Sequence, residues 1–151
     1  MADQMENRGN FLYVIKQLEL VLRPAFLEAC AEQGMTGAQY TALTVLERRP
    51  GITSSELARR SFVRAQTMAG TLDPLLESGL VSRVHDPDHG RRMLLYLTPK
   101  GSRAAAEIAP RIARLEESLL TDLSADERDV FGEFLRRCRH SLSEAIEKRA
   151  T

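Results

Sequence analysis

The sequence predicts a mainly α-helical chain that carries one small β-hairpin. Most of the chain repeats its apolar residues at intervals of three or four, the spacing of an amphipathic helix. Residues 80–84 and 93–97 are instead short, apolar and rich in β-branched or aromatic side chains, as strands are. We therefore expect four helices, two strands and two further helices, in that order.

The first helix is expected to run from Asn10 to about Gly34. An apolar stripe supports it, formed by Phe11, Val14, Ile15, Leu18, Val21 and Leu22. Pro24 interrupts this stripe because proline lacks the N–H that the helix ladder uses. A single long helix with a bend near Pro24 is the prediction.

Three helices are announced by capping boxes, in which a hydroxyl and a Glu or Gln three residues later bind each other's backbone N–H. These boxes are Thr36–Gln39, Thr53–Glu56 and Ser124–Glu127. The helix opened by the first should end before Pro50, and the helix opened by the second should reach about Arg60.

A further helix is expected over Ala65–Ser78, with Gly79 at its C-terminal end and a bend at Pro74. Thr98 and Pro99 then supply an N-cap and a proline at the first helical position. The two helices that follow are long and carry apolar stripes, so both chain ends are expected to form a partner-binding layer.

Composition limits the classes of function. The 151 residues are 43% hydrophobic and carry no formal net charge, so the whole chain does not indicate a polyanion partner. Cys30 and Cys138 are far apart and form no CxxC pair, which favours buried thiols in a reducing compartment. Residues 1–10 lack the pattern of a secretion signal, and no apolar run is long enough to span a membrane. We expect a cytoplasmic protein.

The two helices at 53–60 and 65–78, joined by Ser61–Arg64, match a helix-turn-helix, and the hairpin after them makes it a winged one. Such a unit places its second helix in the major groove of DNA. Ser54 and Ser55, which begin the preceding helix, suit a phosphate oxygen. The residues expected to face base edges are Arg64, Ala65, Gln66, Thr67, Ala69 and Gly70.

The charge of this middle block fits that expectation. Residues 36–100 contain nine Lys or Arg and six Asp or Glu, a net charge of +3 within a neutral chain. Local positive charge is what attracts a nucleic acid.

The stretch HDPDHGRR, residues 85–92, leaves three interpretations. Its His and Asp residues suit a divalent metal, or an acid–base cluster. However, Pro87 and Gly90 break any helix that would align the two histidines. The third interpretation is the tip of a hairpin whose Arg91 and Arg92 face DNA, and we adopt this one. His89 would add positive charge there in mild acid.

The sequence resembles the MarR family of transcriptional regulators along about residues 10–148. The resemblance rests on Met35-Thr36-x-x-Gln39-x-x-x-Leu43, Ser55-Glu-Leu-Ala58, Gln66-Thr67-Met68, Gly79-Leu80-Val81-x-Arg83, Asp86-Pro87, Arg91 and Leu97-Thr98-Pro-x-Gly101. It departs from the family at His89, where Asp is common, and at Arg64, where a capping Ser is usual. At Gly70 many members carry a polar or basic side chain.

The resemblance implies a homodimer held by the first and last two helices and bound to a pseudo-palindromic operator. In that family Arg91 would be the wing-tip arginine that enters the minor groove. An effector pocket is common near the positions of Tyr13, Arg23 and Tyr40, and small aromatic acids are common effectors, although core packing explains each of these residues equally well.

The sequence therefore predicts a single MarR-like chain over 1–151. Residues 36–98 would be the winged helix-turn-helix block, and residues 10–33 and 99–148 the dimerisation helices. The expected function is that of a DNA-binding transcriptional repressor, a homodimer released by a small effector. The alternative is a winged-helix protein–protein module without specific DNA binding. No enzyme, cofactor or metal is expected, since no nucleophile–base pair, phosphate loop or HExxH motif occurs.

Overall fold

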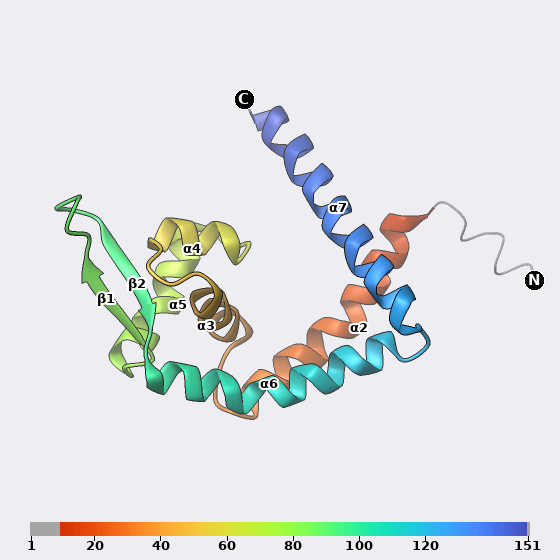
Figure 1. Cartoon of the computed structure of the whole chain (residues 1–151), viewed down its shortest axis with the longest axis horizontal. Helices are drawn as coiled ribbons and strands as arrows, with labels where there is room; N and C mark the ends of the chain where they lie inside the picture. The colour runs from red at the N-terminus through yellow and green to blue at the C-terminus, as the bar shows by residue number, and fades with distance from the viewer. Residues whose placement is uncertain (1–9, 151) are drawn as a thin grey trace, which may run out of the picture. The chain divides into compact units, whose positions relative to one another are not determined.

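The computed structural model describes residues 10–150, and its element order confirms the predicted fold class (Figure 1). The elements are α2 (Phe11–Ala31), α3 (Gly37–Arg48), α4 (Ser54–Arg60), α5 (Ala65–Glu77), β1 (Val81–His85), β2 (Met93–Leu97), α6 (Pro99–Leu120) and α7 (Ala125–Ala150). Residues 1–9, where a secretion signal was sought, lie outside the described range. Within that range, no helix is both long and apolar enough to cross a membrane.

The capping predictions are confirmed at two helices and half wrong at a third. Around Thr36 and around Ser124, both hydrogen bonds of the capping box form. The Thr53 hydroxyl accepts from the Glu56 N–H at 3.2 Å, as expected. The Glu56 carboxylate does not return the bond, because it pairs with the guanidinium groups of Arg59 and Arg60 at the other end of α4.

The residues up to Ala113 form one compact unit, and those from Arg114 onward form a second. The first unit has a single hydrophobic core, to which every helix from α2 to α6 contributes. Its largest fully buried side chains are Cys30, Leu43, Leu46, Leu57, Met68, Leu75, Leu95 and Ile108. The core therefore fixes α4, α5 and the hairpin as one rigid block.

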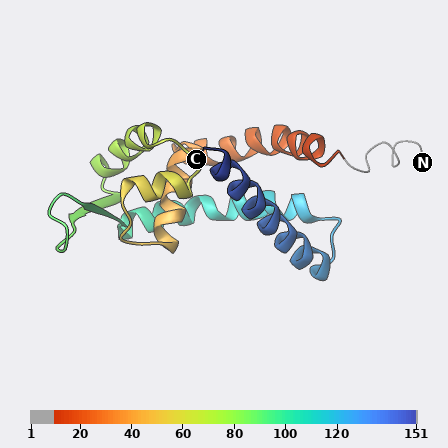
Figure 2. The same ribbon diagram turned by 90° about the horizontal axis from the view of Figure 1, so that it is seen from above.

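The hairpin pairs β1 with β2 in antiparallel register, from Val81 opposite Leu97 to His85 opposite Met93. Its tip projects beyond the helices of the first unit in two perpendicular views (Figure 2). Ile52 forms an isolated bridge with Leu95 and joins the middle of β2 to the loop before α4. The predicted first strand began one residue too early. Leu80 instead donates its N–H to the Leu75 carbonyl and closes the end of α5.

The start of α6 is fastened to the start of the hairpin. The Leu80 carbonyl accepts from the Thr98 N–H at 3.1 Å, and the Thr98 hydroxyl lies 3.1 Å from the same oxygen. That hydroxyl also caps α6 by accepting from the Gly101 N–H at 3.0 Å. A Cβ atom at residue 101 would overlap the Leu80 carbonyl oxygen, so only glycine allows this approach.

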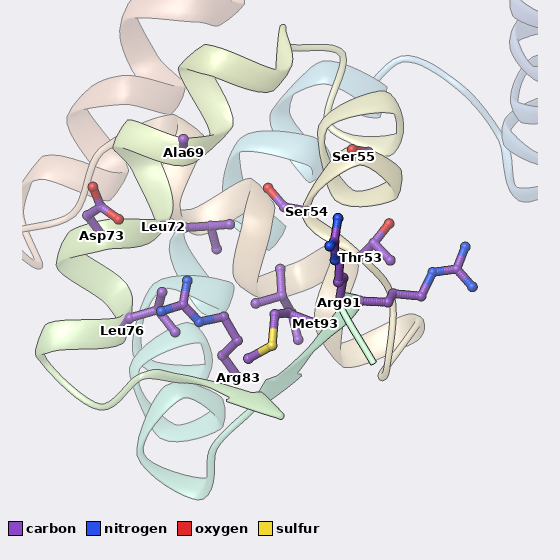
Figure 3. Close-up of a pocket in the computed structure, with 12 residues that line it drawn as sticks. Thr53, Ser54, Ser55, Ala69, Leu72, Asp73, Leu76, Arg83, Arg91 and Met93 are labelled. Atoms are coloured by element: carbon purple, nitrogen blue, oxygen red, sulfur yellow. The ribbon is translucent and has the colours of Figure 1, made fainter. Parts of the chain in front are cut away.

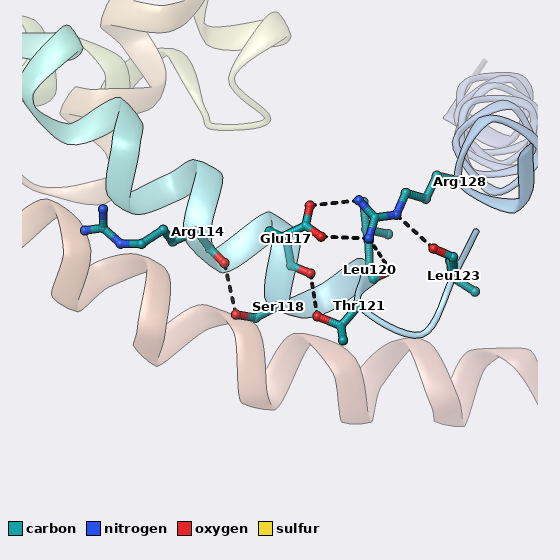
Figure 4. A network of polar contacts seen from close by, with 7 residues as sticks. All are labelled: Arg114, Glu117, Ser118, Leu120, Thr121, Leu123 and Arg128. Atoms are coloured by element: carbon teal, nitrogen blue, oxygen red, sulfur yellow. Dashed lines mark hydrogen bonds and ion pairs between the residues drawn. The ribbon is translucent and has the colours of Figure 1, made fainter. Parts of the chain in front are cut away.

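In the second unit, Arg128 binds back to the last turn of α6 (Figure 4). Its guanidinium group donates to both oxygens of Glu117, at 2.7 and 2.8 Å, and to the Leu120 carbonyl at 2.9 Å. Its Nε donates to the Leu123 carbonyl at 3.0 Å. The Arg128 hydrogen bonds lower the pKa of Glu117, so the pair is charged at neutral pH. One of these bonds uses the carbonyl of Leu120, the last residue of α6, which has no partner inside the helix.

We predict that Gly101→Ala lowers the free energy of unfolding by about 1–3 kcal/mol, because the new methyl group meets backbone that cannot move aside. Urea unfolding followed by circular dichroism at a fixed protein concentration would measure it.

Gly70→Ala is the matched control. A Cβ at residue 70 would meet no atom within 4 Å, and replacing a helical glycine by alanine stabilises by roughly 0.5–1 kcal/mol. Equal midpoints for Gly101→Ala and the unmodified chain would contradict the proposed close approach.

Candidate nucleic-acid interface

The orientation of α5 follows from its buried side. Met68, Leu72 and Leu75 are buried at spacings of four and three, which turns one face of the helix toward the core. The opposite face is therefore exposed. The residues expected from the sequence to meet base edges lie at the N-cap and around the first two turns of α5, and all of them are exposed: Arg64, Ala65, Gln66, Thr67, Ala69 and Gly70.

The beginning of α5 has no side-chain cap. Arg64 occupies the N-cap position and makes no capping hydrogen bond. The first amide N–H groups of a helix have no partner within the helix, and they carry partial positive charge. The exposed face of α5 thus begins with backbone donors and a guanidinium group.

The wing tip is built around Asp86. Its carboxylate accepts from the Asp88 N–H at 3.0 Å, and its backbone binds both Arg92 at 2.8 Å and His89 at 3.2 Å. The same carboxylate lies 4.0 Å from the Arg92 guanidinium. Residues 86–92 are consequently a closed turn between the two strands, and His85 is the last residue of β1.

The two wing arginines differ as a result. Arg92 is held near Asp86, so part of its charge is offset within the tip. Arg91 is exposed and has no ion pair or hydrogen bond within residues 10–150. It is the wing's more available cation for an anionic partner.

Histidine and aspartate do not gather into a metal site at the tip. His85 ends β1 opposite Met93, whereas His89 lies in the turn. Among the described residues, no group of three or more His, Cys, Asp or Glu could hold a metal ion.

A cavity of about 380 Å³ lies between the start of α4, the middle of α5 and the hairpin (Figure 3). Apolar side chains and three arginines share its wall. It is lined by Thr53, Ser54, Ser55, Ala69, Leu72, Asp73, Leu76, Arg83, Arg91, Arg92, Met93 and Leu95. A concave site with an apolar lining and a few charged groups is typical of small-ligand pockets.

The cavity brings together only part of the predicted site. Ser54, Ser55, Ala69, Arg91 and Arg92 line it. The remaining predicted residues, Arg64, Ala65, Gln66, Thr67 and Gly70, are exposed elsewhere on α5 and its N-cap.

Arg83 and Asp73 also line the cavity, although neither was expected from the sequence to be a site residue. Arg83 could have been found from strand alternation. Residues two apart in a strand point to the same side, so Arg83 is expected on the same side of β1 as the buried Val81. Unlike Val81, Arg83 is exposed, as are the two residues that follow it in β1.

The residues considered for an effector pocket in the family lie in different settings. Tyr40 is buried and its ring centroid is 6.1 Å from that of Phe26, so it is a core residue. Burial raises the pKa of its hydroxyl. Tyr13 is exposed on α2, and Arg23 is exposed and pairs with Glu19.

The two cysteines also differ. Cys30 is fully buried, and burial raises the pKa of its thiol, which disfavours the reactive thiolate. For Cys138 the expected burial is wrong within one chain, because the α7 face on which it lies is exposed.

Three comparisons place this architecture among known proteins. The sequence model of the MarR family matches residues 33–92. The chain is 32% identical over 126 residues to the HTH-type transcriptional repressor Mb2911 of Mycobacterium bovis, which covers 83% of this chain and 90% of the relative.

Two solved structures are similar over most of their length. One is the transcriptional repressor CouR bound to a 23-mer DNA duplex, with a TM-score of 0.75, 29% identity, and coverage of 85% of this chain and 92% of that one. The other is the MarR family protein Rv2887 of Mycobacterium tuberculosis in complex with salicylic acid. Its TM-score is 0.68 with 28% identity, and the match covers 85% of this chain and 95% of that one.

Proposed function

Since the chain belongs to the MarR family of transcriptional regulators, we propose that it is a homodimeric repressor that binds a pseudo-palindromic operator and is released by a small acidic effector. The observation that carries this proposal is the joint exposure of α5 and Arg91 on one rigid block. A regulator of this kind acts where the chromosome is, in the cytoplasm, and performs no catalysis.

In the proposed complex, α5 enters the major groove. Gln66 can bind adenine with two hydrogen bonds, Thr67 can touch a thymine methyl, and Arg64 can bind guanine or phosphate. Ala69 and Gly70 would let the backbone approach the bases closely. Ser54 and Ser55 would bind phosphate oxygens, which set the register of the protein on the duplex.

The wing would bind beside the same site. Arg91 is the arginine proposed to enter the minor groove, where a narrow groove has enhanced negative potential. Arg92 would support it from the turn and contribute charge toward the phosphates. DNA that is neutralised by these side chains releases counterions, so binding should weaken as salt rises.

A homodimer is supported by the apolar residues that one chain leaves exposed. On α2 these include Phe11, Leu12, Leu20 and Val21, each more than 65% exposed. On α7 no residue is buried, and its exposed apolar side chains are Val130, Phe134, Leu135, Leu142 and Ile146. An exposed helix face that carries this many large apolar side chains is typical of a protein–protein interface. A symmetric dimer would also present two α5 helices to DNA half-sites about one turn, roughly 34 Å, apart.

The arginine-lined cavity is the proposed effector site. Arg83 and Arg91 suit a carboxylate, while Leu72, Leu76 and Met93 suit an apolar ring. An anion held there would occupy Arg91 and compete with DNA. Release then follows because the effector binds the free protein better than the DNA-bound one.

We predict that the protein prefers DNA flanking its own gene over random DNA by about 10³-fold or more, as specific regulators do. Fluorescence anisotropy at several salt concentrations would measure both affinities.

Arg91→Ala should weaken operator binding and flatten the salt slope by up to about one unit. Arg103→Ala, at an exposed position on α6, is the matched control. A wild-type protein without sequence preference at any salt would favour the protein–protein module instead.

We predict that Phe134→Asp converts the homodimer to a monomer, because a buried, unpaired carboxylate is costly in an apolar interface. Size-exclusion chromatography with light scattering would report the mass. Ser143→Asp is the control, since it adds the same charge on the polar side of α7. A dimer that persists in Phe134→Asp would exclude α7 from the interface.

We predict that salicylate lowers the operator affinity of the wild-type protein, and that Arg83→Gln reduces this response while keeping most of the affinity without salicylate. Arg103→Gln should respond like the wild type. If Arg83→Gln and wild type released DNA at equal salicylate concentrations, the effector would bind elsewhere.

A further inference from the structure

The turn between α4 and α5 contains a phenylalanine, Phe62, whose ring is not packed in the core. Phe62 is 73% exposed. It has φ of +58°, and it is the one residue other than glycine with positive φ among the described residues. A bulky side chain in this region of φ is a conformational outlier that costs free energy.

The local hydrogen bonds explain why positive φ is needed. Phe62 donates its N–H to Arg59 at 3.3 Å, and Val63 donates to Ala58 at 3.1 Å. This pair of bonds is a Schellman motif, which ends a helix with one left-handed residue. Glycine or asparagine is usual at that position. The motif accounts for the backbone but not for the aromatic ring.

In this turn a polar side chain is buried and an apolar side chain is exposed, the reverse of the usual arrangement. Ser61 is buried, and its hydroxyl has no hydrogen-bond partner in the described part of the chain. The apolar ring of Phe62 next to it faces solvent. Both choices cost stability, so a partner outside the monomer offers a reason for the ring.

The surroundings of Phe62 favour DNA as that partner. Arg59, Arg60 and Arg64 lie within three residues of it, all three are exposed, and residues 59–66 contain no acidic side chain. Glu56 offsets charge only at Arg59 and Arg60. An apolar residue amid arginines suits the surface of a polyanion better than an apolar protein patch.

We propose that the Phe62 ring packs against apolar atoms of the operator at the edge of the major groove, next to the base-reading start of α5. Those atoms are either deoxyribose carbons or a thymine methyl group. This inference rests on the proposed DNA binding. It adds Phe62 as a residue that contributes to affinity through burial of apolar surface rather than through charge.

The test compares Phe62→Asn, Phe62→Leu and the wild-type protein. Asparagine tolerates positive φ, so Phe62→Asn should be at least as resistant to urea as the wild type. Its operator affinity should nevertheless fall about tenfold, because the ring no longer leaves water on binding. The salt slope should not change, since no charge is removed. Phe62→Leu should keep part of the affinity.

Two further arms distinguish the DNA atoms and the competing outcomes. Replacing operator thymines by uracil removes the methyl groups one at a time. A uracil that weakens binding of the wild type but not of Phe62→Asn identifies a contact with that thymine methyl group. If no uracil position has this effect, the ring contacts deoxyribose carbons instead.

An unchanged operator affinity in Phe62→Asn would overturn the inference while leaving the proposed function intact. A loss of dimer mass in Phe62→Asn would also overturn it, because the ring would then belong to a protein interface. A wild-type protein without DNA preference would overturn both proposals.

Discussion

The backbone contact between Leu80 and the start of α6 is the constraint on which the arrangement of the first unit depends. The Leu80 carbonyl accepts from the Thr98 N–H, and its oxygen lies so close to Gly101 that a Cβ atom at residue 101 would overlap it. Lys100 adds a bond to the Ser78 carbonyl at 2.7 Å. The end of α5, the base of the wing and the first turn of α6 are therefore held within a few residues of one another, so a rotation of α6 must carry the wing and α5 with it.

That rigidity defines how a regulator built on this chain can respond. The core ties α4, α5 and the hairpin into one block, so the residues proposed to face DNA keep their spacing within a chain. In the proposed homodimer, what can change is the distance between the blocks of two chains, or the access of DNA to Arg91. In the proposed mechanism an effector in the cavity would act on the access of DNA, because Arg91 belongs both to the cavity wall and to the wing tip. Packed interfaces switch between discrete arrangements rather than deform continuously.

Local physical chemistry made most of the fold predictable from sequence. The apolar periodicity, the Thr36 and Ser124 boxes and the Thr98-Pro99 start depend on neighbours within one helical turn, and all appear in the structure. The misses depend on longer or competing contacts. The Glu56 carboxylate pairs with two arginines instead of capping the N-terminus of α4. The Leu80 N–H binds the Leu75 carbonyl at the end of α5, so Leu80 does not belong to β1. The difference between Arg91 and Arg92 depends on the folded turn around Asp86, and the spacing of residues in the sequence does not predict that turn.

The groups best suited to bind DNA are those that the fold leaves unsatisfied. Arg64 leaves the first N–H groups of α5 without a side-chain cap, Arg91 lacks an ion pair within the described residues, and Phe62 adopts positive φ with its ring in water. The missing cap and the positive φ each carry a small free-energy cost in the isolated chain, whereas exposed Arg91 is hydrated and free to pair. In the proposed complex a DNA duplex would offer the three a phosphate, the groove potential and an apolar sugar or methyl surface. Their neighbours Arg92 and Val63 are already engaged, by Asp86 and by the core. Arg92 and Val63 make contacts within the chain and stabilise the turn and the core. The side chains of their neighbours Arg91 and Phe62 make no such contacts within the described residues and are available to a partner.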